Sequence, residues 1–213
     1  MCKRIVALFD FDGVILDTET QYTTLWNKYG KELLGIDDFG EKVKGQSMRQ
    51  IYGTYFKNQE ELQEELNQII HEYELNMSYN YIKGVKSFME ELRERGVPIG
   101  IVTSSDDRKM SIAYQAQPAI KALADIIVTS NQFKRSKPDP ECFLYAMDYF
   151  NASPEETVIF EDSFHGIEAG RAAKAFVVGV STTNKREDIL PLCNRVIPHF
   201  ESMNYKTLKE WMS

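Results

Sequence analysis

Short apolar runs recur along this chain, and longer segments with helical periodicity separate them. The runs cover residues 5–9, 98–102, 125–128, 157–160 and 175–180, with one more at 195–197. Runs of this length, rich in Val and Ile, are typical of strands buried on both faces of a parallel sheet. Because such strands alternate with helices, the pattern predicts βαβ units and an α/β fold with a doubly wound parallel sheet.

The segment after the first run differs from the rest, because residues 20–81 carry no strand pattern. Apolar and aromatic residues recur there at helical spacing, with acidic residues between them. We expect a helical insertion with a hydrophobic core of its own. Further along, a helix over residues 112–123 must break or bend at Pro118, since proline lacks the amide hydrogen that continues a helix.

The first apolar run ends in Asp10-Phe11-Asp12-Gly13. Residues i and i+2 of a strand share a face, so Asp10 and Asp12 point into one site if the extended geometry persists. Gly13 allows the backbone to turn at once. Two carboxylates at the end of a buried strand suit a hard cation such as Mg²⁺, or a division of nucleophile and acid/base roles. The structural alternative is an inert polar turn.

Polar side chains follow the second and third strands as well. Thr103, Ser104 and Ser105 come directly after residues 98–102. A hydroxyl beside free backbone N–H groups at a strand-to-helix turn can bind phosphate oxygens, whereas the structural alternative is a helix N-cap. Lys137 lies in a loop stiffened by two prolines, where it is either a fixed cation against negative charge or a solvated lysine.

The fourth strand ends in Glu161 and Asp162, for which the structural alternative is a capped helix start. The carboxyl ends of parallel strands meet at one edge of the sheet, so acids, hydroxyls and lysine converge there. Such a set can perform phosphoryl transfer through an aspartyl phosphate. Asp10 would attack phosphorus, and Asp12 would protonate the leaving oxygen and then take a proton from water. Mg²⁺ and Lys137 would offset the negative charge.

These motifs resemble, in order and over essentially the whole chain, those of the haloacid dehalogenase-like superfamily. The resemblance points to its branch of β-phosphoglucomutase, phosphoglycolate phosphatase and related sugar-phosphate phosphatases. The four matching motifs are residues 10–19, 102–104, 137–138 and 161–163. The resemblance implies a Rossmann-like core, residues 1–14 and 83–213, with a small α-helical cap domain, residues 15–82, inserted after the first strand.

The resemblance also implies roles for the acids. Asp10 is expected to be the nucleophile and Asp12 the acid/base. Mg²⁺ is the expected cofactor, bound by the carboxylates of Asp10 and Asp162 and by the backbone carbonyl of Asp12. Glu161 is expected to ligate through water or to orient the other groups.

A small phosphate monoester is the substrate that the resemblance implies, a sugar phosphate in this branch. Thr103 and Lys137 are expected to act on the transferring phosphoryl group. The expected substrate contacts are Thr103, Ser104, Ser105, Lys137 and, from the cap, Arg49. The cap would close over the site, exclude water and carry substrate selectivity.

Only cap residues can indicate whether the chain is a phosphatase or a mutase, because both classes share all of these core residues. The mutase carries a His on the first cap helix, where Tyr22 stands here, and a cap-loop Arg at the position of Met48. Arg49 follows one residue later, and a one-residue shift would restore that arginine, so Tyr22 is the firmer departure. These departures favour water as the acceptor. We therefore expect a Mg²⁺-dependent phosphatase that works through an aspartyl phosphate, with a β-phosphoglucomutase-type phosphosugar mutase as the alternative.

A receiver-type phospho-acceptor signalling domain is the alternative from a different class. It too uses strand-end acids, a hydroxyl and a lysine on a doubly wound sheet. Such a domain would be shorter, would have no helical insertion after its first strand, and would lack an acid two residues after the nucleophile. Asp12 and residues 20–81 therefore favour the enzyme.

Composition limits the classes of partner and the cellular compartment that we expect for this protein. The formal net charge of −7 argues against general nucleic-acid or membrane-surface binding. A metal and local cations can still admit an anionic substrate, so a small-molecule phosphate ester is the expected partner. We expect no secretory signal and no membrane span, and the widely spaced Cys2, Cys142 and Cys193 indicate reduced thiols in a cytoplasmic protein. The sequence leaves the oligomeric state open.

Overall fold

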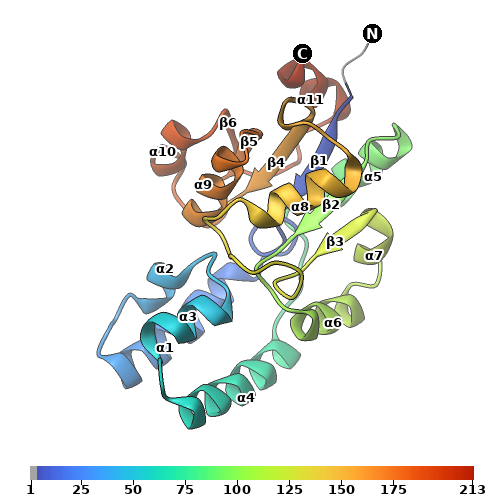
Figure 1. Cartoon of the computed structure of the whole chain (residues 1–213). Helices are drawn as coiled ribbons and strands as arrows, with labels where there is room; N and C mark the ends of the chain where they lie inside the picture. Colours follow the sequence, from blue (N-terminus) through green and yellow to red (C-terminus); the bar gives the residue numbers. More distant parts are fainter. Residues whose placement is uncertain (1–3) are drawn as a thin grey trace.

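A computed structural model describes residues 4–213, and within them six parallel strands form one sheet. The strands are β1 (Val6–Phe9), β2 (Ile99–Val102), β3 (Ile126–Val128), β4 (Thr157–Glu161), β5 (Phe176–Val180) and β6 (Arg195–Ile197). Their order across the sheet is β3-β2-β1-β4-β5-β6, which confirms the doubly wound topology (Figure 1). Ligand sites of such sheets lie where the winding reverses, which here is between the carboxyl ends of β1 and β4.

Helices cover both faces of the sheet (Figure 1). They are α5 (Val85–Glu94), α6 (Asp107–Ala116), α7 (Ile120–Leu123), α8 (Glu141–Phe150), α9 (Phe164–Ala172), α10 (Arg186–Ile189) and α11 (Tyr205–Met212), with short 3₁₀ turns at Pro154–Glu156 and Leu190–Leu192. Successive side chains of β1 point to opposite faces. Phe9 accordingly packs with α5 and α11, whereas Leu8 packs with α8 and α9.

An aromatic cluster lies directly below the carboxyl end of β1. The rings of Phe9 and Phe160 stack with centroids 4.6 Å apart, and Phe88 and Phe200 pack around them. All four side chains are buried. Because close-packed interiors deform little, this cluster holds the strand ends that carry the acids in fixed positions.

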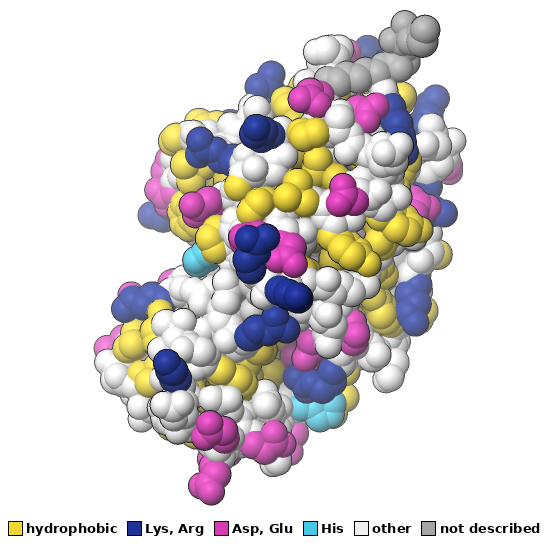
Figure 2. Space-filling view, in the orientation of Figure 1, with side chains coloured by type: hydrophobic (Ala, Val, Ile, Leu, Met, Phe, Trp, Pro, Cys, Tyr) yellow, Lys and Arg dark blue, Asp and Glu magenta, His cyan; other side chains and the backbone are white. Residues whose placement is uncertain are grey.

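The insertion after β1 is helical, as predicted. Its helices are α1 (Glu19–Leu34), α2 (Phe39–Val43), α3 (Met48–Tyr55) and α4 (Glu60–Asn76). They bury a hydrophobic cluster of their own around Trp26, Phe39 and Leu66, and form a second body beside the sheet (Figures 1 and 2). The two connections lie side by side, since Leu16 and Tyr81 form an antiparallel bridge. The division into core and cap at residues 15 and 82 stays a prediction.

Most predicted elements are confirmed with ends shifted by a residue, and one helix begins earlier than predicted. The segment predicted as a helix over 112–123 is two helices separated around Pro118, and the first of them, α6, starts at Asp107. It starts there because the Asp106 side chain accepts a hydrogen bond from the Lys109 N–H at 2.9 Å and caps the helix. No helix among the described residues is long and apolar enough to cross a membrane.

Candidate active site

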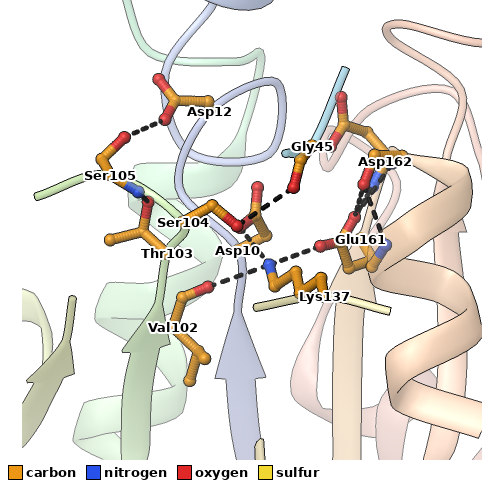
Figure 3. A network of polar contacts seen from close by, with 12 residues as sticks. Asp10, Asp12, Gly45, Val102, Thr103, Ser104, Ser105, Lys137, Glu161 and Asp162 are labelled. Carbon is orange, nitrogen blue, oxygen red and sulfur yellow. Dashed lines mark hydrogen bonds and ion pairs between the residues drawn. The ribbon is translucent and has the colours of Figure 1, made fainter. Parts of the chain in front are cut away.

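Lys137 is the cation at the centre of the site, and it is only 1% exposed. Its Nζ donates to Asp10 Oδ1 and Glu161 Oε1, each at 2.6 Å, and to the Val102 carbonyl at 3.2 Å (Figure 3). Burial lowers the pKa of this ammonium, but the two carboxylates outweigh burial, and the pKa lies above its ordinary value. The loop lysine is therefore the shared counter-ion of the acids that end β1 and β4.

Glu161 is held by the turn that starts α9. Its Oε2 accepts hydrogen bonds from the backbone N–H groups of Asp162 and Ser163, each at 2.9 Å, and from the Ser163 hydroxyl at 3.0 Å. Its Oε1 is taken by Lys137. With both oxygens engaged, Glu161 suits the orienting role that was one of its two predicted uses.

Asp162 lies against the first acidic turn. Thr183 donates its hydroxyl to Asp162 Oδ2, and Asn184 donates its side-chain amide to the Asp162 carbonyl at 2.8 Å. Gly13 adopts a φ of +77°, and a Cβ there would clash with Asp162 Oδ2, so both the backbone conformation and the close approach of Asp162 require glycine. Sequence reasoning missed Thr183 and Asn184, although they follow β5 at the same edge of the sheet and the strand-end rule could have found them.

The acids of this edge fit a divalent cation. Among residues 4–213, the group whose ligand atoms all lie within 4.8 Å of one another consists of Asp10, Glu161 and Asp162. Burial, together with the neighbouring carboxylates of Glu161, Glu19 and Asp10, raises the pKa of Asp162 well above its ordinary value. Three buried carboxylates lie here, and the Lys137 ammonium pairs with only Asp10 and Glu161, so the group is short of positive charge. An oxygen-only donor set of this kind suits Mg²⁺ better than softer metals.

Asp12 is bound by three donors on the other side of the cleft. The Thr18 hydroxyl and the Lys109 ammonium bind Oδ1, the ammonium at 2.5 Å, and the Ser105 hydroxyl binds Oδ2 at 2.8 Å. Burial raises the pKa of Asp12, but the Lys109 charge and these hydrogen bonds outweigh burial and lower it. Lys109 was not predicted, because it belongs to the charged run 106–109, a pattern typical of a solvent-exposed first helical turn.

The three predicted hydroxyls all reach the site, but each already has a protein partner. Thr103 is buried, and its Oγ1 accepts a hydrogen bond from the Ser105 N–H at 3.0 Å. Ser104 donates to the Gly45 carbonyl of the cap at 3.1 Å, and Ser105 donates to Asp12 (Figure 3). Their binding of phosphate oxygens stays a prediction.

The cap is closed over these residues, and a cavity of about 300 Å³ remains between cap and core. The Ser47 and Ser136 hydroxyls are 2.7 Å apart across the junction, and the Gln50 side-chain amide donates to the Lys137 carbonyl at 2.8 Å. Helix α3 therefore docks on the loop that carries the central lysine.

Two cap residues singled out in the sequence have partners within the protein. The Arg49 guanidinium donates to the Lys134 carbonyl at 3.1 Å, at a junction where Lys and Arg side chains gather (Figure 2). Arg49 also lines the cavity, and its contact with substrate stays a prediction. The Tyr22 hydroxyl donates to Glu74 Oε1 at 2.8 Å, so α1 and α4 are tied together above the site.

Glu19, at the start of α1, makes the stability of the folded protein depend on pH. Glu19 is half-buried, and the loss of water around its carboxyl, followed by the Asp12 carboxylate, raises its pKa from 4.5 to about 7. Between these values the folded metal-free protein holds a proton that the unfolded chain has released, so stability falls as pH rises through this window. We expect Glu19→Gln to flatten that fall in urea unfolding from pH 5 to 8 with a chelator. An unchanged slope would contradict the assignment.

Comparison with known proteins gives consistent matches. The sequence model described as haloacid dehalogenase-like hydrolase matches residues 7–180. The phosphorylated carbohydrates phosphatase of Thermotoga maritima is 27% identical over 78% of this chain and 80% of that protein. The β-phosphoglucomutase of Bacillus subtilis is 28% identical over 82% of each chain. Among solved structures, a haloacid dehalogenase-family hydrolase of Entamoeba histolytica has a TM-score of 0.83 and 21% identity, covering 98% of this chain and 99% of that one.

Proposed function

Because the chain belongs to the haloacid dehalogenase-like hydrolase family and is a phosphoryl-transfer enzyme, we propose that it is a Mg²⁺-dependent phosphatase. Its substrate would be a small phosphate monoester, and a sugar phosphate is favoured by the relative from Thermotoga maritima, whose name states phosphorylated carbohydrates. The reaction would pass through an aspartyl phosphate on Asp10.

The observation that carries this proposal is the state of the Asp10 carboxylate. One oxygen, Oδ1, is fixed by Lys137, whereas Oδ2 accepts no hydrogen bond from residues 4–213, and the side chain lines the cavity. A carboxylate held at one oxygen and open at the other suits in-line attack on phosphorus, because orientation is supplied before the substrate arrives.

The proposed chemistry has two balanced steps. First, with Asp12 protonated in the substrate complex, where the negative phosphoryl group favours its neutral form, an Asp10 oxygen bonds to phosphorus, the bond from phosphorus to the leaving oxygen breaks, and Asp12 gives that oxygen its proton. Then a water oxygen bonds to phosphorus, Asp12 takes the water proton, and the bond to Asp10 breaks to release phosphate. Lys137 offsets charge on Asp10 throughout, and Thr103 would bind a phosphoryl oxygen.

Asp10 and Asp162 would hold Mg²⁺ through their carboxylates, with the Asp12 carbonyl as a further ligand and Glu161 as the residue that orients them. When bound, the ion would neutralise the crowded carboxylates and the transferring phosphoryl group. Thr183 and Asn184 fix Asp162 in place, as outer-shell partners of metal ligands do.

Water is favoured as the acceptor because a group that would hold a sugar bisphosphate, so that phosphate returns to the sugar, differs here. Tyr22 stands where the mutase carries a His, and its hydroxyl is committed to Glu74. The second candidate function is a phosphosugar mutase, which is favoured by the 28% identity to the Bacillus subtilis β-phosphoglucomutase.

Phosphorus NMR separates the two candidates. The protein is incubated with Mg²⁺, β-glucose 1-phosphate and a little glucose 1,6-bisphosphate. We expect inorganic phosphate to accumulate, and a chelator to slow its release by roughly 100-fold or more, since a metal supplies several kcal/mol of charge stabilisation. Accumulation of glucose 6-phosphate would identify a mutase instead, and an unchanged rate after chelation would remove Mg²⁺ from the proposal.

A further inference from the structure

Lys109 is a buried cation in the cleft that none of the proposed steps uses. It lies on α6 and is 5% exposed. Its Nζ is 2.5 Å from Asp12 Oδ1 and 4.2 Å from the centroid of the Tyr22 ring, which belongs to the cap helix α1. Burying an ammonium costs several kcal/mol even when it is paired, so stability alone is a poor reason for a lysine at this place.

The contacts around Lys109 form a closed ring between core and cap. Tyr22 covers the Lys109 ammonium with its ring and donates its hydroxyl to Glu74 on α4. The other oxygen of Glu74 lies 3.2 Å from the guanidinium of Arg108, the residue that precedes Lys109 on α6. In the closed cap the Tyr22 ring therefore contacts Lys109, and Arg108, its neighbour on α6, pairs with Glu74 of the cap.

Lys109 determines how the Asp12 carboxylate is turned. Thr18 and Ser105 each offer Asp12 one hydroxyl, and hydroxyls rotate freely about their C–O bonds. The ammonium is the only charged donor to Asp12 in the part of the chain that the structure describes. Charge-assisted hydrogen bonds are shorter and about twice as strong as neutral ones, so the ammonium dominates the orientation of the carboxylate.

We propose that Lys109 is a positioning residue that aims Asp12 at the leaving-group oxygen, and that Tyr22 makes this alignment depend on cap closure. The inference rests on the proposed phosphatase function. It adds a residue that acts through Asp12, and it gives Tyr22 a role in the alignment of Asp12.

The proposal predicts a loss that depends on the leaving group. An alkoxide must be protonated as it departs, whereas p-nitrophenolate leaves without a proton. A mis-aimed Asp12 should therefore slow alkyl esters and spare p-nitrophenyl esters. The ratio kcat/KM reports the steps up to departure of the leaving group, so slow hydrolysis of the phosphoenzyme does not mask the difference.

The test compares p-nitrobenzyl phosphate with p-nitrophenyl phosphate, two esters of nearly equal size. We expect Lys109→Met to lower kcat/KM roughly 100-fold for the benzyl ester, as an ångström-scale misplacement does, and less than about 5-fold for the phenyl ester. Lys109→Arg keeps the charge and should recover part of the benzyl activity. Tyr22→Leu should shift the ratio in the same direction as Lys109→Met.

Lys121→Met is the matched control, because Lys121 also lies over a tyrosine ring, at 4.6 Å from Tyr114, but on the surface. Thermal unfolding checks that each variant folds. Equal losses on both esters, no loss, or a change confined to KM would each overturn the positioning role. A wild-type protein that releases phosphate from neither ester and from no sugar phosphate would instead overturn the phosphatase proposal, and the inference with it.

Discussion

Asp10→Asn is expected to lower turnover by roughly 10⁴-fold or more, on the scale of removing an enzyme nucleophile. The amide has the shape of the carboxylate but cannot form the acyl phosphate, because its oxygen is a poor nucleophile at phosphorus. The fold should persist, since the asparagine oxygen can still accept the Lys137 hydrogen bond that Asp10 Oδ1 accepts at 2.6 Å.

Steady-state release of p-nitrophenol, together with acid-quench trapping of the phosphoenzyme, measures the effect. The variant should accumulate no trapped phosphate while its unfolding temperature stays close to that of the wild type. Asp148→Asn, an exposed position on α8, is the matched control and should retain full activity. A normal rate in Asp10→Asn would mean that the covalent step does not occur on this residue.

Lys137→Met is expected to destabilise the metal-free protein by about 3–5 kcal/mol, the cost of removing one partner from a buried ion pair. Both Asp10 and Glu161 lose their shared counter-ion in this variant. Turnover should fall as well, because the acids then repel an incoming phosphate. Urea unfolding in the presence of a chelator measures the loss.

A second substitution tests the physical cause. Lys137→Met combined with Glu161→Gln removes one of the two stranded charges, so the double variant should lose less stability than the sum of the single losses. Lys134→Met, at an exposed neighbouring position, is the control and should change stability by less than about 0.5 kcal/mol. A loss below 1 kcal/mol in Lys137→Met would show that burial of the pair contributes little.

The sheet and the central ion pair followed from local sequence pattern and one topological rule. Apolar runs separated by helical periodicity predicted the parallel sheet, and the strand-end rule brought Lys137 to Asp10 across 127 residues. The rule works over such a separation because every parallel strand delivers its carboxyl end to the same edge. The same rule, applied to β5, would have found Thr183 and Asn184 beside Asp162.

The surroundings of Asp12 could not be predicted in this way. Lys109 comes from a helix side, and which way a helical residue faces depends on how that helix is rotated against its neighbours. Its burial further requires the cap, since Tyr22 covers it from α1. A charged run at the start of a helix indicates neither the rotation of that helix nor the presence of a covering cap. The partner of Arg49, a backbone carbonyl of the core, was likewise not predictable from the sequence.

The sequence by itself determined the doubly wound core, the helical insertion and the set of acids, hydroxyls and lysine at one edge of the sheet. Period and strand order are local properties, and parallel pairing converts them into a common location. Only the tertiary structure decided which partners each acid takes, because hydrogen bonding depends on how the strands, loops and helices pack together. That packing left Asp10 with one open oxygen and placed the Lys109 ammonium of α6 against Asp12.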